Sequence, residues 1–219
     1  MGSNGTRPRC SAIKKMKIKF SLPKDSKRHR YCLNCFSENV TDIVLKGKRL
    51  YRCDSCHQIH DRLIDIDPAL KWWVDKKTGE YHHESVGMIV IGFDNRILFF
   101  ERTIFPYGHT IPAGHLEINE KPEIAALREL KEETGLSLSK AKLFKEEDLP
   151  GDPCRRGADF HFWHLYVTKL NASFIPIIAK DEGKKPIWLD LNQALKRKLT
   201  PPVRYFLEKY KNEITDSLL

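Results

Sequence analysis

Several features are missing from this 219-residue sequence, and each absence limits what the protein can be. No stretch approaches the roughly 18 consecutive apolar residues of a membrane-spanning helix, so a soluble protein is expected. The sequence shows no secretory signal pattern and no internal repeat. We therefore expect a reducing compartment, the cytoplasm, with an organelle as the alternative if residues 1–28 are a transit peptide.

Acidic residues are scarce at the N-terminus. Residues 1–30 contain ten Lys or Arg and one acid, Asp25, which leaves 28 of the 38 basic and 28 of the 29 acidic residues for the rest. The net charge of +9 therefore belongs to this arm, and residues 1–28 are predicted to be disordered. Its role stays open between a solubilising tail, a transit peptide, a myristoylated anchor and a weak contact with nucleic acid or an anionic surface. Residues 1–15 are alternatively a cloning remnant, with Met16 as the natural start.

Cysteine is rare, with six residues, yet four of the six form a pattern. Two Cys-x-x-Cys pairs separated by seventeen residues are typical of a structural zinc site made of Cys32, Cys35, Cys53 and Cys56. We expect residues 29–60 to form a zinc ribbon with a β-hairpin that turns at 46–48, and residues 61–83 to form a connector. Two disulfides are the alternative. In the connector, Trp72 and Trp73 either pack the ribbon against the next domain or stack on a base.

The segment 114–136 is the most informative part of the chain. Gly114 permits a tight turn, Pro122 favours the first turn of a helix, and Gly135 favours its end. Within this helix three carboxylates share one face, and three apolar residues are predicted to face a core: Glu129, Glu132 and Glu133, and Ile124, Leu127 and Leu130. Three adjacent like charges repel one another, which indicates a hard divalent cation such as Mg²⁺. The alternative is a surface helix with an acidic end.

The same segment resembles the signature of the Nudix hydrolases. Nine specified positions agree at fixed offsets: Gly114, Glu120, Arg128, Glu129, Leu130, Glu132, Glu133, Gly135 and Leu136. The resemblance implies an α/β fold in which residues 84–219 form an α/β/α sandwich around a mixed sheet. The apolar runs agree with this fold, since strands are expected at 85–93, 96–101, 142–149, 158–170 and 186–191, followed by a terminal helix from Thr200.

The resemblance also implies a chemistry, the Mg²⁺- or Mn²⁺-dependent hydrolysis of a nucleoside diphosphate linked to another group. The implied metal ligands are Glu129, Glu132, Glu133 and the Gly114 carbonyl. Arg128 and Glu120 are the implied structural pair. The general base is either Glu132 or Glu182, whose loop Asp181-Glu182-Gly183 is otherwise simply polar.

Substrate contacts lie outside the signature. We expect Arg102, Arg155 and Arg156 to contact phosphates, and Phe160 either to stack on a base or to pack in the core. A zinc ribbon before a Nudix domain is similar to two branches, one acting on NADH and one on ADP-ribose or FAD. The NADH branch carries a further signature that residues 137–157 lack. We therefore favour an ADP-containing dinucleotide; the alternatives are NADH or an NAD cap, and a nucleic-acid-binding or nucleotide-sensing module. A homodimer is left open.

Overall fold

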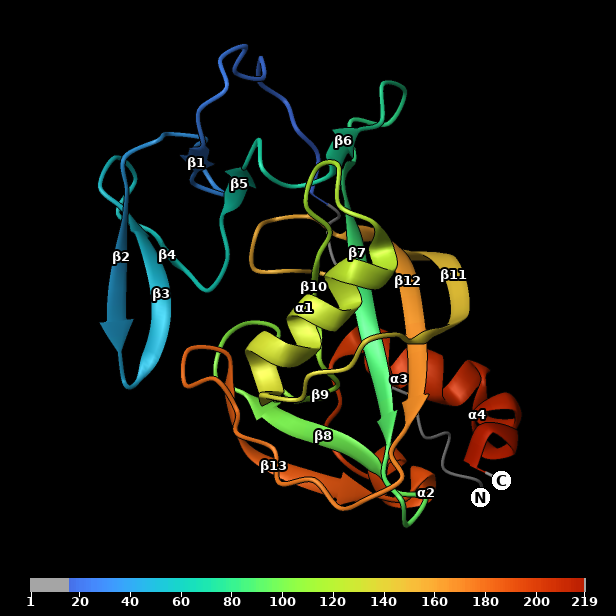
Figure 1. The fold of residues 1–219 in the computed structure, drawn as a ribbon. Helices are drawn as coiled ribbons and strands as arrows, with labels where there is room; N and C mark the ends of the chain where they lie inside the picture. The colour runs from blue at the N-terminus through green and yellow to red at the C-terminus, as the bar shows by residue number, and fades with distance from the viewer. Residues whose placement is uncertain (1–15, 219) are drawn as a thin grey trace, which may run out of the picture.

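The central strand of the protein is β7 (Tyr81–Ile91), eleven residues long and buried over nearly its whole length. In this computed structural model, which describes residues 16–218, its side chains alternate between two hydrophobic clusters. Val86, Met88 and Val90 face the helix α1 (Pro122–Thr134), while Ile89 and Ile91 face α3 (Pro201–Lys209) on the other side of the sheet. The predicted α/β/α sandwich is thereby confirmed (Figure 1).

The main sheet is mixed. The strands β11, β12, β7, β8 and β13 pair in that order, with β6 and β10 also pairing with β7, and β9 with β8. Strand β12 runs parallel to β7 along one edge of β7, and β10 runs antiparallel to β7 along part of the opposite edge. The strands span β6 (Trp72–Val74), β8 (Ile97–Arg102), β9 (His109–Thr110), β10 (Ala113–His115), β11 (Lys142–Pro150), β12 (Phe160–Lys169) and β13 (Gly183–Leu189).

Helix α1 begins and ends where the sequence predicts, with Pro122 in its first turn and Gly135 in a left-handed conformation (φ 76°) after its last. The prediction that Ile124 faces the core is wrong, because its side chain is 54% exposed. The buried face is centred on Ala126 and Leu130, and at about 100° per residue Ile124 lies almost opposite Ala126. The same geometry turns Glu133 towards the sheet.

The C-terminal residues cover the other face of the sheet. Helix α2 (Leu191–Leu195) begins at a capping box, α3 follows, and α4 (Lys211–Leu218) continues after a break at Tyr210. The terminal helix expected from Thr200 is present as α3 and α4, and its apolar residues Val203, Phe206, Leu207 and Ile214 are buried in one cluster with Tyr210 packed against it. None of the helices in residues 16–218 is long and apolar enough to cross a membrane.

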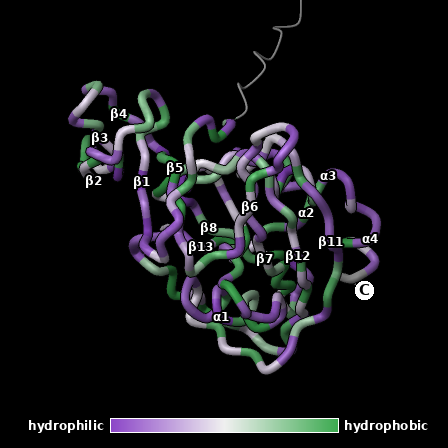
Figure 2. The backbone as a smooth tube through the Cα atoms, turned by 90° about the horizontal axis from the view of Figure 1, so that it is seen from above, coloured by the Kyte–Doolittle hydropathy of each residue, from purple (hydrophilic) through white to green (hydrophobic). Residues whose placement is uncertain are grey.

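The N-terminal lobe stands beside this domain (Figure 2). It contains a three-stranded antiparallel sheet, β2 (Val40–Leu45), β3 (Lys48–Cys53) and β4 (Ile59–His60). The hairpin turns at Lys46 and Gly47, both with positive φ (51° and 73°), a geometry that matches the twist of the strands. A pair of short strands, β1 (His29–Tyr31) and β5 (Ile64–Ile66), connects this lobe to the main domain.

A third hydrophobic cluster joins the two parts. It contains Tyr31, Ile64 and Tyr81, with Trp72 packed against it. Trp72 therefore packs the ribbon lobe against the main domain, which is the first of the two alternatives given for it. Trp73 stacks on His82 instead. The cluster also receives the side chains Met16, Ile18, Phe20 and Leu22. The prediction of disorder is therefore wrong for residues 16–28, because their apolar side chains cover the cluster. Residues 1–15 lie outside the described residues.

Candidate active site

A cavity of about 310 Å³ opens between α1, the end of β8 and the loops before β12 and β13. Carboxylates and guanidinium groups meet in it from segments far apart in the sequence. Its lining includes Arg102, Glu129, Glu133, Arg155 and Glu182. This is the place where the predicted metal face and most of the predicted substrate contacts come together.

Gly114 lies directly against Glu129. A methyl group added at residue 114 would stand 2.0 Å from Oε1 and 2.1 Å from the carboxyl carbon of Glu129. Glycine is therefore required here for close approach rather than for an unusual backbone angle. The contact places the carboxylate of α1 next to the backbone of β10.

Arg128 holds the loop between β10 and α1 against the helix. Its guanidinium donates to both oxygens of Glu120 at 3.0 Å, to Oε1 of Glu129 at 2.8 Å, and to Oε2 of Glu132 at 3.3 Å. The predicted Arg128–Glu120 contact is thus present. The hydrogen bonds from Arg128 lower the pKa of Glu120, so this carboxylate stays ionised.

Burial distinguishes the three glutamates of α1. The side chain of Glu132 is 59% exposed and that of Glu129 is 16% exposed, whereas Glu133 is 3% exposed and accepts a 2.8 Å hydrogen bond from the Ala113 N–H. Burial raises the pKa of Glu133 well above its usual range, and the charges of Glu129 and Glu182 add to this. Burial also raises the pKa of Glu129, although Arg128 opposes the shift. A bound cation would reverse both effects.

The glutamates of α1 do not converge on one point in this structure. Among residues 16–218, two other groups bring their ligand atoms within 4.8 Å of one another, the four ribbon cysteines and a cluster of three histidines and Cys154. Glu132 turns instead towards Arg128, and Glu133 towards the Ala113 N–H. Gathering a metal would need rotation of side chains that already share the cavity.

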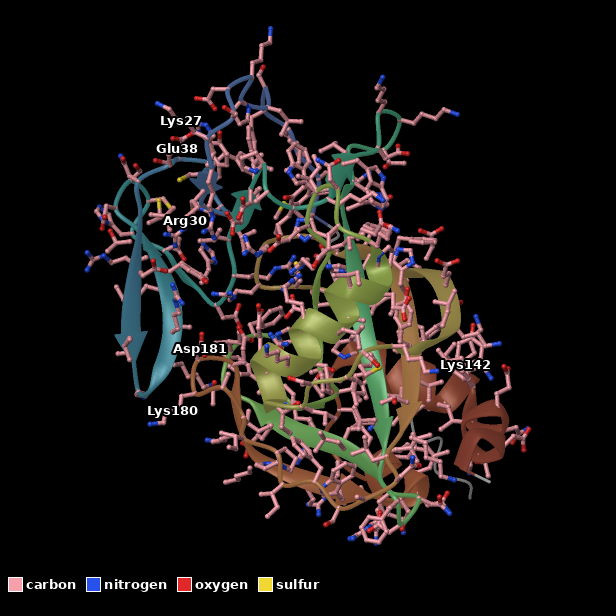
Figure 3. All side chains as sticks on the ribbon, in the orientation of Figure 1. Lys27, Arg30, Glu38, Lys142, Lys180 and Asp181 are labelled. Atoms are coloured by element: carbon pink, nitrogen blue, oxygen red, sulfur yellow. The ribbon has the colours of Figure 1, made fainter. Side chains whose placement is uncertain are left out.

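Glu182 belongs to the same cavity, although its loop is 49 positions beyond Glu133 in the sequence. Ala179 N–H donates to the Glu133 carbonyl at the end of α1, and the N–H of Glu182 donates in turn to the Ala179 carbonyl. This anchoring brings a carboxylate to the metal face, the first of the two alternatives for this loop. Asp181 is exposed on the outside of the loop (Figure 3).

The predicted substrate contacts have different surroundings. Arg102 lies 3.9 Å from Glu182, and Arg155 donates to the hydroxyl of Tyr51 on β3, so the ribbon contacts this loop. Arg156 instead forms ion pairs with Asp65 (2.6 Å) and Asp67 (3.0 Å), which anchor the loop to β5. Phe160 is buried against His82 outside the cavity lining, so the packing alternative describes its position.

Comparison with known proteins agrees with this geometry. Residues 81–210, more than half of the chain, match the NUDIX domain. The chain belongs to the Nudix family. It is a Nudix hydrolase whose fold places the signature helix against the central strand of the sheet, and enzymes of this family act on nucleotide pyrophosphates with a divalent metal.

Individual relatives cover parts of this Nudix hydrolase. The methanol dehydrogenase activator of Bacillus methanolicus is 38% identical over 123 residues, 52% of this chain, and the match spans only 62% of that relative. The MutT Nudix hydrolase of Burkholderia pseudomallei shares 26% identity over 59% of this chain and 98% of its own, with a TM-score of 0.50. The Nudix domain of Shewanella oneidensis NrtR, complexed with ADP ribose, has a TM-score of 0.53 at 16% identity, over 64% of this chain and 93% of its own.

The four ribbon cysteines form a compact cluster ahead of the Nudix domain. The Sγ atoms of Cys32 and Cys56 are 3.7 Å apart, and those of Cys35 and Cys53 are 3.5 Å apart. A tetrahedral zinc with Zn–S bonds of 2.3 Å requires about 3.8 Å along each edge. The two loops are alike, because the N–H of Cys32 donates to the Ser37 carbonyl and that of Cys53 to the Gln58 carbonyl, each at 2.9 Å. The cluster therefore fits one zinc ion.

Sequence reasoning missed one group of cavity residues. His115, His161 and Cys154 line the cavity wall, with His83 behind them. They are widely separated in the sequence and no ligand spacing connects them, so no motif could have indicated them. Strand pairing brings them together, since His161 lies beside His83 in the parallel register of β12 and β7.

Proposed function

We propose that this Nudix hydrolase cleaves the pyrophosphate of a nucleoside diphosphate linked to another group, with ADP-ribose, FAD or a related dinucleotide as the substrate class. The observation that carries the proposal is the shared cavity, in which Glu129, Glu133 and Glu182 face Arg102 and Arg155. A site of both charges fits a reaction in which an anionic pyrophosphate must be bound together with a cation. The cavity volume of about 310 Å³ lies near the lower limit of the range found for small-molecule binding sites.

Glu129, Glu132, Glu133 and the Gly114 carbonyl would hold Mg²⁺ or Mn²⁺. These donors fit a hard divalent cation, because all of them are oxygen atoms. Burial also brings the Glu129 and Glu133 carboxylates close together with too little neighbouring positive charge to balance them. The metal would screen the pyrophosphate and lower the pKa of the attacking water. Arg128 supports this arrangement, because its guanidinium donates a hydrogen bond to Glu129 and is itself held by a hydrogen bond to Glu120.

The other charged side chains at the cavity are proposed to bind phosphate, to hold the arginine loop or to accept a proton. Arg102 and Arg155 would each donate to phosphate oxygens, since neither has a carboxylate within 3.5 Å in the described part of the chain. Arg156 would hold the Arg155 loop in place through Asp65 and Asp67. Glu182 would accept the proton of the attacking water, with Glu132 as the alternative base. Both lie at the cavity, and within residues 16–218 the one ion pair of Glu182 is with Arg102 at 3.9 Å.

The zinc ribbon is proposed as a structural support. One zinc bound by Cys32, Cys35, Cys53 and Cys56 would stabilise a lobe whose apolar core is small. Through Tyr51 this lobe contacts Arg155, so the metal would support a substrate contact without taking part in the chemistry. We assign residues 29–60 to the ribbon, 61–83 to the connector and 84–219 to the hydrolase domain, and the family match begins slightly earlier, at residue 81.

The Nudix domain of Shewanella oneidensis NrtR, which has the same fold, is complexed with ADP ribose, so ADP-ribose is the first substrate to test. The test is a Mg²⁺-dependent hydrolysis panel of ADP-ribose, FAD, NADH, NTPs, dNTPs and NAD-capped RNA, with the products identified. The matched control is Glu133→Gln, which keeps side-chain size but removes the charge. We expect AMP among the products from ADP-ribose or FAD, and activity lost in the variant. Cleavage of NADH or capped RNA alone would refute the substrate class; no Mg²⁺-dependent cleavage of any member would refute the reaction.

A further inference from the structure

A second group of side chains with metal-ligand chemistry lies in the wall of the cavity, apart from the glutamates of α1. It consists of His83 on β7, His115 on β10, Cys154 in the loop after β11 and His161 on β12, and one ligand atom of each lies within 4.8 Å of all the others. Three of the four residues are buried and His115 is half-buried. Among the described residues, Nε2 of His83 and Nε2 of His115 are buried without a hydrogen-bond partner.

We propose that these four residues bind a transition-metal ion, with Zn²⁺ as the best match. Three imidazoles and one thiolate form an N₃S set, which suits the borderline-soft, tetrahedral Zn²⁺ and not Mg²⁺. The Cys154 Sγ atom is 3.6 Å from Nδ1 of His83. With Zn–S and Zn–N bonds of the usual length, that edge of a tetrahedron is also about 3.6 Å.

Packing around the group gives the ligands a fixed orientation. The rings of His83 and His115 meet edge to face with centroids 4.7 Å apart, and the ring of His161 lies 5.6 Å from that of His83. Asp152, itself 3% exposed, places Oδ2 3.2 Å from Nδ1 of His161 and accepts a 2.8 Å hydrogen bond from the Trp163 indole. A buried carboxylate behind a histidine is the usual outer support of a metal ligand.

Occupation of the site would affect the neighbouring substrate contacts. Cys154 directly precedes Arg155, and His115 directly follows Gly114. A metal held by these residues would tie the arginine loop and the start of the signature segment to the two central strands. Because all four positions of a tetrahedral ion are taken by protein, its role is structural and distinct from that of the ion on α1.

Metal content tests the proposal without reference to catalysis. Full-length protein purified with added Zn²⁺ and freed of loose metal would be analysed by mass spectrometry, together with Cys154→Ser, Cys53→Ser and the control Cys10→Ser. We expect two zinc ions per chain in the parent and in the control, and one in each of the other two variants. One zinc in the parent, unchanged by Cys154→Ser and absent in Cys53→Ser, would overturn the proposal. This outcome is independent of whether any nucleotide is hydrolysed.

A measurement on the unmodified protein covers the case in which Cys154→Ser fails to fold. Anomalous diffraction at the zinc edge places the ions directly. A peak between His83, His115 and His161, besides the ribbon peak, supports the site; a ribbon peak alone, in zinc-loaded crystals, refutes it.

Discussion

The contact between Gly114 and Glu129 permits a sharp test of the active-site geometry. In Gly114→Ala the new methyl group would meet three atoms of the Glu129 carboxyl group at 2.0, 2.1 and 2.5 Å. An ordinary contact needs at least 3.4 Å, so the carboxylate must move by about 1.4 Å. It cannot do so freely, because Arg128 holds it at 2.8 Å and because it is largely enclosed.

The expected cost is mainly catalytic. A displacement of about 1 Å in a positioned group can reduce turnover about 100-fold, which corresponds to about 2.7 kcal/mol of transition-state stabilisation. Overpacking of this kind typically destabilises a fold by only about 1–3 kcal/mol. We therefore expect Gly114→Ala to remain folded while kcat falls by about two orders of magnitude.

The assay compares kcat and KM for the best substrate of the panel with thermal unfolding of the same preparations. Gly47→Ala is the matched control, since its methyl group meets nothing within 4 Å and only the positive φ of 73° opposes the substitution. That variant should lose about 1 kcal/mol of stability with unchanged kcat. Unchanged kcat in a folded Gly114→Ala protein would show that the position of Glu129 does not limit the reaction.

Three further predictions follow from burial and charge. Glu133→Gln should lower kcat by at least about 100-fold. Because burial raises the pKa of Glu133 in the folded protein, the metal-free parent should lose stability as the pH rises above the unfolded value of 4.5, and the variant should lose less. Thermal midpoints measured between pH 5 and 8 in magnesium-free buffer test this difference. An identical pH dependence in both proteins would contradict the assignment. Cys53→Ser should release the ribbon zinc and lower the thermal midpoint. Metal analysis that finds no zinc in the parent, with disulfides mapped among its four ribbon cysteines, would exclude a ribbon site. Deletion of residues 1–15 should leave kcat/KM unchanged but weaken salt-sensitive binding to RNA or anionic vesicles. Deletion up to residue 28 should also destabilise the fold, because it removes Met16–Leu22 from the third hydrophobic cluster. A loss of kcat/KM beyond tenfold in the shorter deletion would place the arm at the active site.

The amino-acid sequence by itself determined the features that depend on local spacing. The Nudix signature predicted the helix from Pro122 to Thr134 and the Arg128–Glu120 pair, because contacts within about twenty residues follow from helix and turn geometry. The tight turn expected at Gly114 was wrong, since this residue lies in strand β10. The two Cys-x-x-Cys pairs likewise predicted a cysteine cluster, since each pair is a single local loop. The alternating strands and the terminal apolar stripe predicted the layered fold.

Tertiary structure alone decided which side chains share the cavity. Helical spacing placed three glutamates on one face but could not show that Glu133 is buried and Glu132 exposed, nor that Ile124 faces away from the core, because this depends on how α1 rotates onto the sheet. Glu182 reaches the same place because its loop is hydrogen-bonded to the end of α1 and because the Thr103 N–H donates to the Glu182 carbonyl. His83, His115, Cys154 and His161 meet because β10, β7 and β12 are neighbours, and the order of strands in a sheet follows from packing across the whole chain rather than from spacing along it.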